Sequence, residues 1–514
     1  MKKRLVFLAL AAFVILTACA DPDSSDPNDP FGDMIGLSSS SDAQPDTALR
    51  SFSLPYFKNR TLDPITCPDG IHQTLGALLY DGLFTLDETL TLRPALATGY
   101  SYDAANREYT IALRSGITFS DGSPVSASDV VATLRRAQIS ERYAARLAEM
   151  VSVSGSGNTV YITLSTDCAG FASRLDIPIV KTGTEDQMIP VGTGLYCCAE
   201  DDKGLYLTPN LHRWRQGTLP IARIALKDCK DEESLPYAFN AQQIQLLACD
   251  LTGTTSASFS GSGEYIDAAT TVMQYIGCNT GTGIFSDAAL RAAVSAGIDR
   301  VGCVNAYLLG HGHAAQFPLS PVCALYPVSM EQTYSPDNYL AALEAAGYNT
   351  GVLRTATLLV NEENPFRVHA ARKIAADLSQ YDIQISVSAL PWEEYRTALT
   401  AGRYDLYYGE CRLSADWDLT ALLGEGGALN FSAYADEELT RLITEDRAAN
   451  PDRRGDTMRA LCARLQTQSP FVPISFKNIS MLLPSGALDG VIPTAANPFF
   501  NLPDWTVHWA NAEE

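Results

Sequence analysis

Apolar and polar residues alternate with regular periods along most of this 514-residue chain, which predicts a succession of strands and helices. Residues 108–113 (EYTIAL) alternate polar and apolar side chains, as a strand with one buried face does. Ser120-Asp121-Gly122 then predicts a turn, because Asp closes a local side-chain turn and Gly accepts a positive φ. Ser126-Ala127-Ser128-Asp129 supplies N-cap oxygens for a helix with apolar residues on one side.

The second half of the chain alternates strand and helix patterns. Strands are expected at 354–360, 383–389 and 404–408, and helices at 364–380 and 392–401. This strand–helix order predicts a parallel sheet with helices packed on it. The other predicted elements are strands at 51–57, 160–164, 205–210, 221–226, 471–475 and 478–483, and helices at 73–83, after Asp287, at 437–447 and at 453–468.

Composition and charge exclude some classes of function. Hydrophobic residues make up 46% and charged residues 19% of the chain, as in soluble globular proteins. The formal net charge of −22 repels phosphate backbones, so we expect no binding to nucleic acid. The sequence contains no GxSxG, HExxH or GxxxxGK[ST] motif, which argues against a hydrolase or a nucleotide-dependent enzyme.

One short segment raises the question of a metal site. His311-Gly312-His313 would place two imidazoles on one face of a strand, a spacing that suits a metal ion. The family resemblance described below places this segment in a glycine-rich loop, which implies a solvated loop instead. We therefore predict no metal site.

The N-terminal residues have the pattern of a targeting segment. Lys2-Lys3-Arg4 precedes an apolar run that is too short to span a bilayer. Leu16-Thr17-Ala18-Cys19 resembles the lipobox of bacterial lipoproteins, which implies removal of residues 1–18 and diacylation of Cys19; the alternative is an ordinary secretory signal with an incidental Cys. Residues 19–47 are rich in Asp, Ser and Pro and predict a disordered tether. We expect a protein that is lipid-anchored on the extracytoplasmic face of the bacterial cell membrane.

The cysteines do not suggest a disulfide framework. Twelve are present, and setting Cys19 aside leaves an odd number that cannot all pair within the chain. No CxxC pair occurs, so zinc-ribbon and thioredoxin sites lack their motif. The adjacent Cys197 and Cys198 would point to opposite faces of a strand. These two thiols are therefore expected to be small buried apolar groups.

Several short motifs follow one another in a fixed order along the chain. They are Thr61-Leu62-Asp63-Pro64, Pro94-Ala95-Leu96-Ala97, Leu113-Arg114-Ser115-Gly116, Phe119-Ser120-Asp121-Gly122, Ala127-Ser128-Asp129-Val130, Val191-Gly192-Thr193-Gly194, Phe285-Ser286-Asp287 and Ala296-Gly297-Ile298-Asp299-Arg300. Together they resemble the family-5 extracellular solute-binding proteins, which include the oligopeptide- and dipeptide-binding lipoproteins of ABC importers. Leu195, where the family has Pro, and Gly297 depart from that pattern.

The resemblance implies an α/β fold with two lobes. It is the periplasmic-binding-protein-like (type II, Venus-flytrap) fold with an extra subdomain in the first lobe. The implied divisions are a first lobe at 48–65, 166–265 and 475–510, an extra subdomain at 66–165 and a second lobe at 266–474.

The resemblance also implies ligand-binding residues. Ser414-Ala415-Asp416-Trp417 is similar to the family's segment at the lobe interface, in which the acid receives the N-terminal ammonium of a peptide. That role falls on Asp416, with Ala415 and Trp417 beside it, because an ammonium buried in a closed cleft needs a carboxylate partner. Arg412 is a candidate for a ligand carboxylate.

The opposite wall of the cleft is placed by counting along the same resemblance. Gly70, Ile71 and His72 fall where peptide binders present backbone to their ligand. Gly70 would permit a close approach, and His72 would meet a ligand side chain. A lone His is also a common structural residue, so both roles stay open for it.

The function expected from these observations is that of a substrate-binding lipoprotein of an ABC transporter. It would capture short peptides between the lobes and deliver them to a membrane permease, as a monomer, without catalysis and without a cofactor. The alternatives are another solute on the same fold, such as a nickel chelate or an oligosaccharide, and a surface hydrolase.

Overall fold

The computed structural model describes residues 48–253 and 263–510. The predicted signal peptide (1–18), Cys19 and the predicted tether (19–47) lie outside the described residues. Within them, no helix combines the length and the apolar character needed to cross a bilayer. The fold is mixed α/β, as the sequence predicts, and most strands belong to three sheets.

The sheet of the first lobe has the strand order β1-β10-β9-β8. β1 and β10 run parallel, whereas the other two pairs are antiparallel. Leu54, Leu207 and Ile224 lie in its core, which the C-terminal Leu483 and Phe499 complete. The elements are β1 (Phe52–Tyr56), α1 (Gly70–Leu79), β8 (Tyr196–Asp201), β9 (Gly204–Pro209), β10 (Ile224–Asp228), η2 (Glu232–Ser234), α3 (Leu235–Asn240), β11 (Leu247–Cys249), β18 (Leu488–Asp489), η5 (Leu502–Asp504) and β19 (Thr506–Val507).

The sheet of the extra subdomain, β4-β5-β7-β6, is antiparallel throughout. The predicted cap of the helix beside it is present, because the backbone N–H of Ser126 donates to Asp129 Oδ2 at 3.0 Å. Tyr109, Ile111 and Val130 meet in one buried cluster between helix and sheet. The elements are β2 (Phe84–Leu86), β3 (Leu92–Pro94), β4 (Ala97–Asp103), β5 (Glu108–Leu113), α2 (Ala127–Gln138), β6 (Met150–Ser156), β7 (Thr159–Leu164) and η1 (Phe171–Arg174).

The sheet of the second lobe has the order β11-β17-β12-β16-β14-β15, with β13 paired to β17. β14 runs parallel to β15 and β16, as predicted, but β11, β12, β13 and β17 pair antiparallel, so the sheet is mixed. The elements are β12 (Gly263–Cys278), η3 (Ile284–Ser286), α4 (Ala288–Ala296), α5 (Arg300–Tyr307), β13 (Gly312–Ala314), η4 (Val328–Met330), α6 (Pro336–Ala345), β14 (Arg354–Asn361), α7 (Pro365–Leu378), β15 (Ile383–Leu390), α8 (Trp392–Thr400), β16 (Leu406–Arg412), α9 (Thr420–Leu423), α10 (Glu437–Ala448), α11 (Pro451–Gln468) and β17 (Phe471–Pro484).

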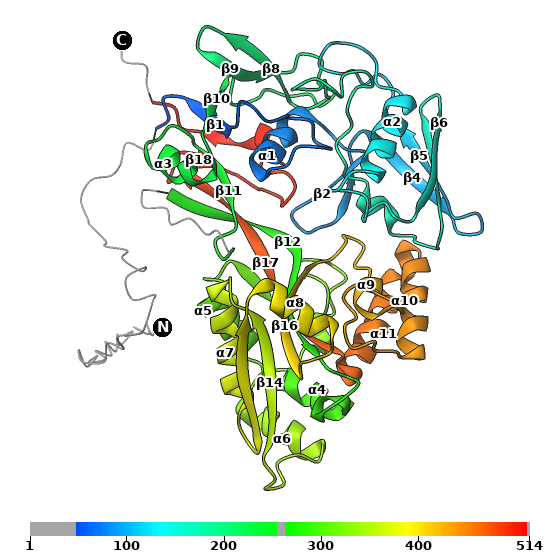
Figure 1. Cartoon of the computed structure of the whole chain (residues 1–514). Coiled ribbons are helices and arrows are strands. Elements are labelled where there is room, and N and C mark those ends of the chain that lie inside the picture. The colour runs from blue at the N-terminus through cyan, green and yellow to red at the C-terminus, as the bar shows by residue number, and fades with distance from the viewer. Residues whose placement is uncertain (1–47, 254–262, 511–514) are drawn as a thin grey trace, which may run out of the picture. The chain divides into compact units, whose positions relative to one another are not determined.

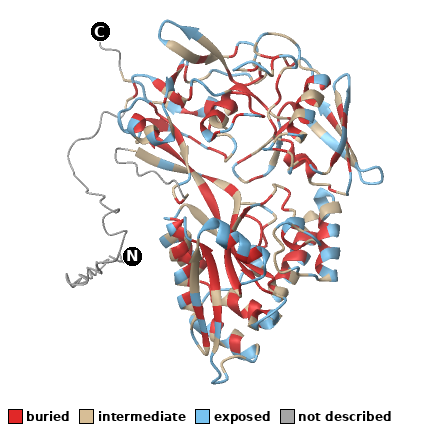
Figure 2. Cartoon of the chain, in the orientation of Figure 1, coloured by how far each residue is buried: buried red, intermediate tan, exposed pale blue. Residues whose placement is uncertain are grey.

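Helices cover both faces of this second-lobe sheet. Leu358 and Val360 of β14 share a buried cluster with Ile374 of α7. The intervening Leu359 belongs to a different cluster, with Leu399 of α8. Successive side chains of a strand point to opposite faces, so α7 and α8 pack on opposite sides, and Figure 2 shows the strands between them as mostly buried.

Two long strands, β12 and β17, pass through both lobes side by side (Figure 1). Their pairing begins at Gly263 opposite Pro484 and ends at Gly277 opposite Phe471. The sequence predicts two strands at 471–475 and 478–483, and this is wrong, because one continuous strand spans both. The pairing of β12 with β17 fixes the direction in which the chain crosses between the lobes. The register of the two strands shifts between Ala269 and Met273, and the strand pair bends at this irregularity.

Three other sequence predictions need correction. The helix expected at 73–83 begins earlier, at Gly70, because Asp69 accepts the N–H of His72 and caps it. The helix after Asp287 breaks into α4 and α5 around Gly297, where an added Cβ would lie 2.7–2.9 Å from Leu378 and Tyr339. The loop expected at 311–313 contains β13.

The described residues include eleven free cysteines. Several are fully buried; burial raises the pKa of the Cys278 and Cys303 thiols to about 12. Cys197 and Cys198 lie on β8 and are half-buried rather than fully buried as expected; Cys198 packs on the first-lobe core. These thiols fill apolar space as protonated groups.

Leu358→Ala tests the core of the second-lobe sheet. Leu358 has no exposed surface, so its truncation should lower the free energy of unfolding by about 2–5 kcal/mol through lost contacts and a cavity. The matched control is Leu353→Ala, because Leu353 is 62% exposed and its loss should cost less than about 0.5 kcal/mol. Urea titration followed by circular dichroism measures both, and equal costs would contradict this description of the core.

Candidate ligand-binding site

Asp416 lies in the loop that follows β16 and precedes α9, and only 6% of it is exposed. Trp417 adopts a positive φ of 59° and packs its ring edge-on against Phe476, with centroids 5.9 Å apart. The indole is thus part of the second-lobe core, while Ala415 is half-buried. The bend at Trp417 turns the Asp416 side chain away from that core.

The carboxylate of Asp416 meets a cation from the first lobe. Its Oδ2 accepts hydrogen bonds from Arg174 Nε at 3.0 Å and Nη2 at 2.6 Å. The thiol of Cys168 donates to the same oxygen at 3.4 Å. Arg174 ends the short helix η1, so this buried ion pair joins residues 242 positions apart.

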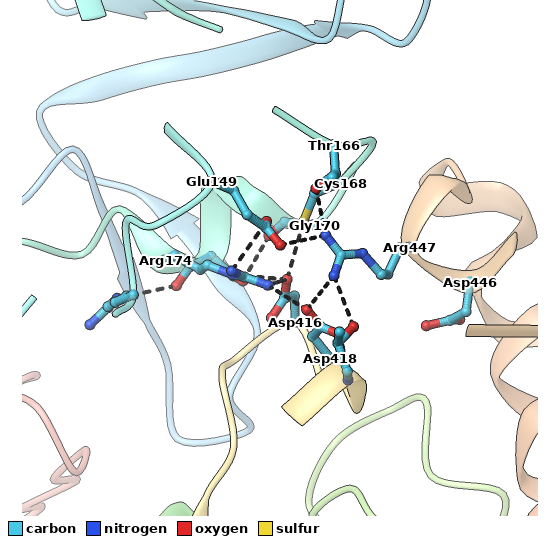
Figure 3. Close-up of polar contacts among 12 residues, drawn as sticks. Glu149, Thr166, Cys168, Gly170, Arg174, Asp416, Asp418, Asp446 and Arg447 are labelled. Atoms are coloured by element: carbon cyan, nitrogen blue, oxygen red, sulfur yellow. Dashed lines mark hydrogen bonds and ion pairs between the residues drawn. The ribbon is translucent and has the colours of Figure 1, made fainter. Parts of the chain in front are cut away.

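A second arginine extends the pair into a network (Figure 3). Arg447, at the end of α10, donates to Glu149 Oε1 at 2.5 Å and to Asp418 Oδ2 at 2.8 Å. Arg174 reaches the same two acids, at 3.4 Å and 3.1 Å. We call Glu149, Arg174, Asp416, Asp418 and Arg447 the interlobe cluster, because the first two come from the first lobe with its extra subdomain and the other three from the second lobe.

The cluster shifts the pKa values of its members. Burial alone would raise the pKa of Asp416, but the adjacent Arg174 guanidinium outweighs it and lowers that pKa below the usual 3.8. Burial likewise opposes charge on Arg174, and the attraction of Asp416 reverses the effect and raises its pKa. Both groups are therefore ionised at neutral pH, and burial raises the pKa of the Cys168 thiol, which stays protonated.

A cavity of about 610 Å³ lies beside the interlobe cluster. Tyr100 and Tyr102 of β4 line one side and Asn450 the other, so both lobes contribute to its walls. Ala169 links the cavity to the cluster, because it lines the former and donates its N–H to the carbonyl of Arg447 at 2.7 Å. A cavity of this volume suits a small organic ligand.

The residues predicted for the opposite wall lie at the start of α1. Gly70 and Ile71 form its first turn. His72 is 1% exposed; its Nε2 accepts the N–H of Phe57 at 2.9 Å, and its Nδ1 lies 2.8 Å from the carbonyl oxygen of Thr61. Both ring nitrogens are thus used within the fold, and the predicted contact of His72 with a ligand stays a prediction.

Arg412, the predicted partner of a ligand carboxylate, ends β16 opposite Val272. Its side chain is exposed, and no ion pair to it occurs among the described residues. Partial desolvation lowers the pKa of Arg412, and the nearby Glu410 partly offsets this, so its predicted contact with a ligand carboxylate stays a prediction. The two predicted charges, Asp416 and Arg412, stand four residues apart on one strand end and its loop.

Sequence reasoning missed Glu149, Arg174 and Arg447. They come from separate segments, and no local spacing relates them to Asp416. One signal was present: Arg174 is a charge within the apolar run Phe171–Val180 (FASRLDIPIV), where an unpaired cation would be costly.

The described residues contain no group of three His, Cys, Asp or Glu side chains that could hold a metal ion. His311 of the pair considered above lies 2.9 Å from Asp267 Oδ1 and contacts no second acid there. This arrangement is an ordinary ion pair at the edge of the sheet.

Asp416→Asn tests the ion pair through pH. Because the folded-state pKa is lowered, the pair stabilises the fold above pH 3.8, and this contribution is lost as the pH falls below that value. Wild type should melt at a higher temperature than Asp416→Asn at neutral pH, by the equivalent of about 3 kcal/mol, and the gap should close below pH 3.8. Asp456→Asn is the control, because Asp456 is an exposed acid on α11; a gap that is independent of pH would contradict the assignment.

Comparison with known proteins gives relatives of the same architecture. The glutathione-binding protein GsiB of Salmonella typhi is 23% identical over 472 residues, which cover 86% of this chain and 91% of that protein. The crystal structure of a nickel ABC transporter protein from Bacillus halodurans matches with a TM-score of 0.74 at 22% identity, covering 88% of this chain and 98% of that one. The unliganded open form of the murein tripeptide-binding protein MppA matches with a TM-score of 0.74 at 19% identity, covering 90% and 98%.

These structural matches confirm the predicted fold, which is the two-lobed fold of periplasmic binding proteins. The family model of the bacterial extracellular solute-binding proteins, family 5 Middle, matches residues 91–422. This range spans well over half of the chain and contains both arms of the Arg174–Asp416 pair. The chain therefore belongs to the family-5 bacterial extracellular solute-binding proteins.

Proposed function

We propose that this protein is the substrate-binding lipoprotein of an ABC importer and that its solute is a short peptide. The observation that carries the proposal is the ionised, buried carboxylate of Asp416 at the face between two lobes. A cavity of about 610 Å³ lies next to the interlobe cluster, although Asp416 itself does not line it. A buried carboxylate is the group that an ammonium needs when it leaves water. Membership of the family supports the role in transport.

The ligand contacts follow from this assignment. Asp416 would receive the N-terminal ammonium, and the exposed Arg412 nearby would meet a carboxylate. Ala415 would pass close to the peptide backbone, and Trp417 would hold the loop in place from the core. Gly70 and Ile71 would face the ligand from the start of α1.

The permease would recognise the closed form, in which both lobes contact the ligand. The predicted lobe boundaries place the crossing strands β12 and β17 between the two bodies, where hinge motion is expected. The protein would bind its solute without transforming it and would work as a monomer. Cys19, once diacylated, would hold it at the extracytoplasmic face of the membrane, with residues 19–47 as the tether.

Heat-shift screening tests the ligand class. With the chain from Asp21 onward, short peptides at 100 times their Kd should stabilise the folded state by about 2.7 kcal/mol. Nickel salts, nickel–histidine and oligosaccharides should give no shift. Stabilisation by one of these and not by peptides would replace the peptide with that solute, and turnover of any of them would point to an enzyme.

Asp416→Ala tests the ammonium contact. Loss of the carboxylate should weaken the binding of a free-amino peptide by about 100-fold, because the ligand cation would be buried without a partner. Asp456→Ala is the control on α11 and should bind as wild type does. Calorimetric titration measures both, and unchanged binding to Asp416→Ala would remove this role.

Cys19→Ala tests the anchor. Replacement removes the thiol that would carry the diacyl group, so the protein should move from the membrane fraction to the soluble fraction and lose palmitate labelling. Cys67→Ala is the matched control, since Cys67 is a buried thiol within the fold and should leave both readouts unchanged. Membrane retention of Cys19→Ala would favour the ordinary secretory signal.

A further inference from the structure

The two carboxylate oxygens of Asp416 differ in their hydrogen bonds within the protein. Its Oδ2 takes both hydrogen bonds from Arg174, whereas its Oδ1 is buried and accepts no well-formed hydrogen bond among the described residues. The Ser414 hydroxyl lies close enough to the carboxylate to lower its pKa. A buried acceptor that is not fully satisfied is costly in a native structure, so Oδ1 can still accept a hydrogen bond from a donor outside the chain.

The charges of the interlobe cluster do not balance. Three carboxylates, Glu149, Asp416 and Asp418, face two guanidiniums, Arg174 and Arg447. Two neighbouring ion pairs, Arg454 with Asp446 and Arg146 with Asp176, carry no net charge of their own, and Arg454 also donates to the Asp416 carbonyl oxygen. Cys168 is a neutral thiol, so the five residues of the interlobe cluster have a formal net charge of −1.

Arg174 has other partners if it leaves Asp416. Its guanidinium lies 3.1 Å from Asp418 Oδ2 and 3.4 Å from Glu149 Oε2. Withdrawal from Asp416 would therefore leave no bare cation, and the main cost of breaking a buried ion pair would be avoided. An incoming ammonium would take Asp416 while Arg174 stayed with the other two acids.

We propose that Arg174 is a specificity-determining residue, which occupies Asp416 in place of the ligand's cation until a ligand with a free ammonium displaces it. The inference rests on the proposed function and deepens it. A solute with a neutral end carries no cation that could replace the guanidinium of Arg174 beside Asp416. Such a solute would have to break the Arg174–Asp416 ion pair without forming a new one. The pair thus selects peptides with a free N-terminus over acylated peptides and neutral solutes.

The experiment compares trialanine with N-acetyl-trialanine by calorimetric titration at neutral pH. Wild type should bind the free-amino peptide, and the acetylated peptide should bind at least about tenfold more weakly. Arg174→Met removes the competitor and leaves three acids facing one arginine. It should bind trialanine about tenfold tighter than wild type, equivalent to about 1.4 kcal/mol, with no gain for the acetylated form.

Two further variants make the outcome unambiguous. Arg174→Lys keeps the charge but not the forked geometry and should fall between wild type and Arg174→Met; it decides the question if Arg174→Met does not fold. Arg459→Met, which removes an exposed arginine paired only with Asp456 on α11, should bind as wild type does.

The two levels of the proposal fail differently. Peptide binding that depends on Asp416 but is equal or weaker in Arg174→Met would overturn the role of Arg174 and leave the peptide receptor standing. If neither wild type nor Arg174→Met binds either peptide, both the peptide assignment and the role of Arg174 are overturned.

Discussion

A buried ion pair between Arg174 and Asp416 is the constraint on which the site depends. Each charge comes from a different lobe, and each is buried at a cost that its partner must offset. The pair can exist only when the lobes meet, so within its own lobe Arg174 keeps only Glu149 as an acid partner and Asp416 lacks its main cation. Arg447 reinforces the contact by bridging Glu149 and Asp418. Electrostatics, more than apolar area, therefore defines how these surfaces fit together.

The apolar contact across the same interface is narrow. Leu90, at the tip of the β2–β3 hairpin, is buried in the cluster that contains Trp417 and Phe476 of the second lobe. Its positive φ of 59° places it there, and Asp87 supports the turn by accepting the N–H groups of Thr89 and Thr91. Within this apolar cluster, Leu90 is the buried side chain that the β2–β3 hairpin supplies, and it lies near the charged contact of the interlobe cluster, because Trp417 adjoins Asp416.

Local periodicity and capping residues were enough to predict much of the fold. The strand at Glu108–Leu113 and the cap at Ser126 were predicted from period and spacing alone, and the parallel pairing of β14 followed from the strand–helix order. The continuity of strand β17 was not predicted, because Lys477 and its neighbours are polar. They are nevertheless buried, since β17 pairs with strands on both sides. Tertiary pairing there overrides the local pattern.

The candidate site could be predicted only in part. Asp416 was found because it lies in a segment that carries the family resemblance, whereas Arg174 lies 242 residues away and has no spacing relation to it. No local sequence pattern distinguishes an acid that binds a ligand from an acid that forms an ion pair within the protein. His72 shows the converse, since a lone His looked available and proved to be held at both nitrogens.

The buried thiols carry a consequence for how such a chain matures. In the part of the chain that the structure describes, every cysteine is reduced, and most are shielded within apolar layers. Export delivers an unfolded polypeptide in which all of them are accessible at once. Oxidising enzymes at the cell surface would then compete with collapse and create wrong crosslinks. Rapid burial of the thiols protects against this, so the chain gains from folding quickly.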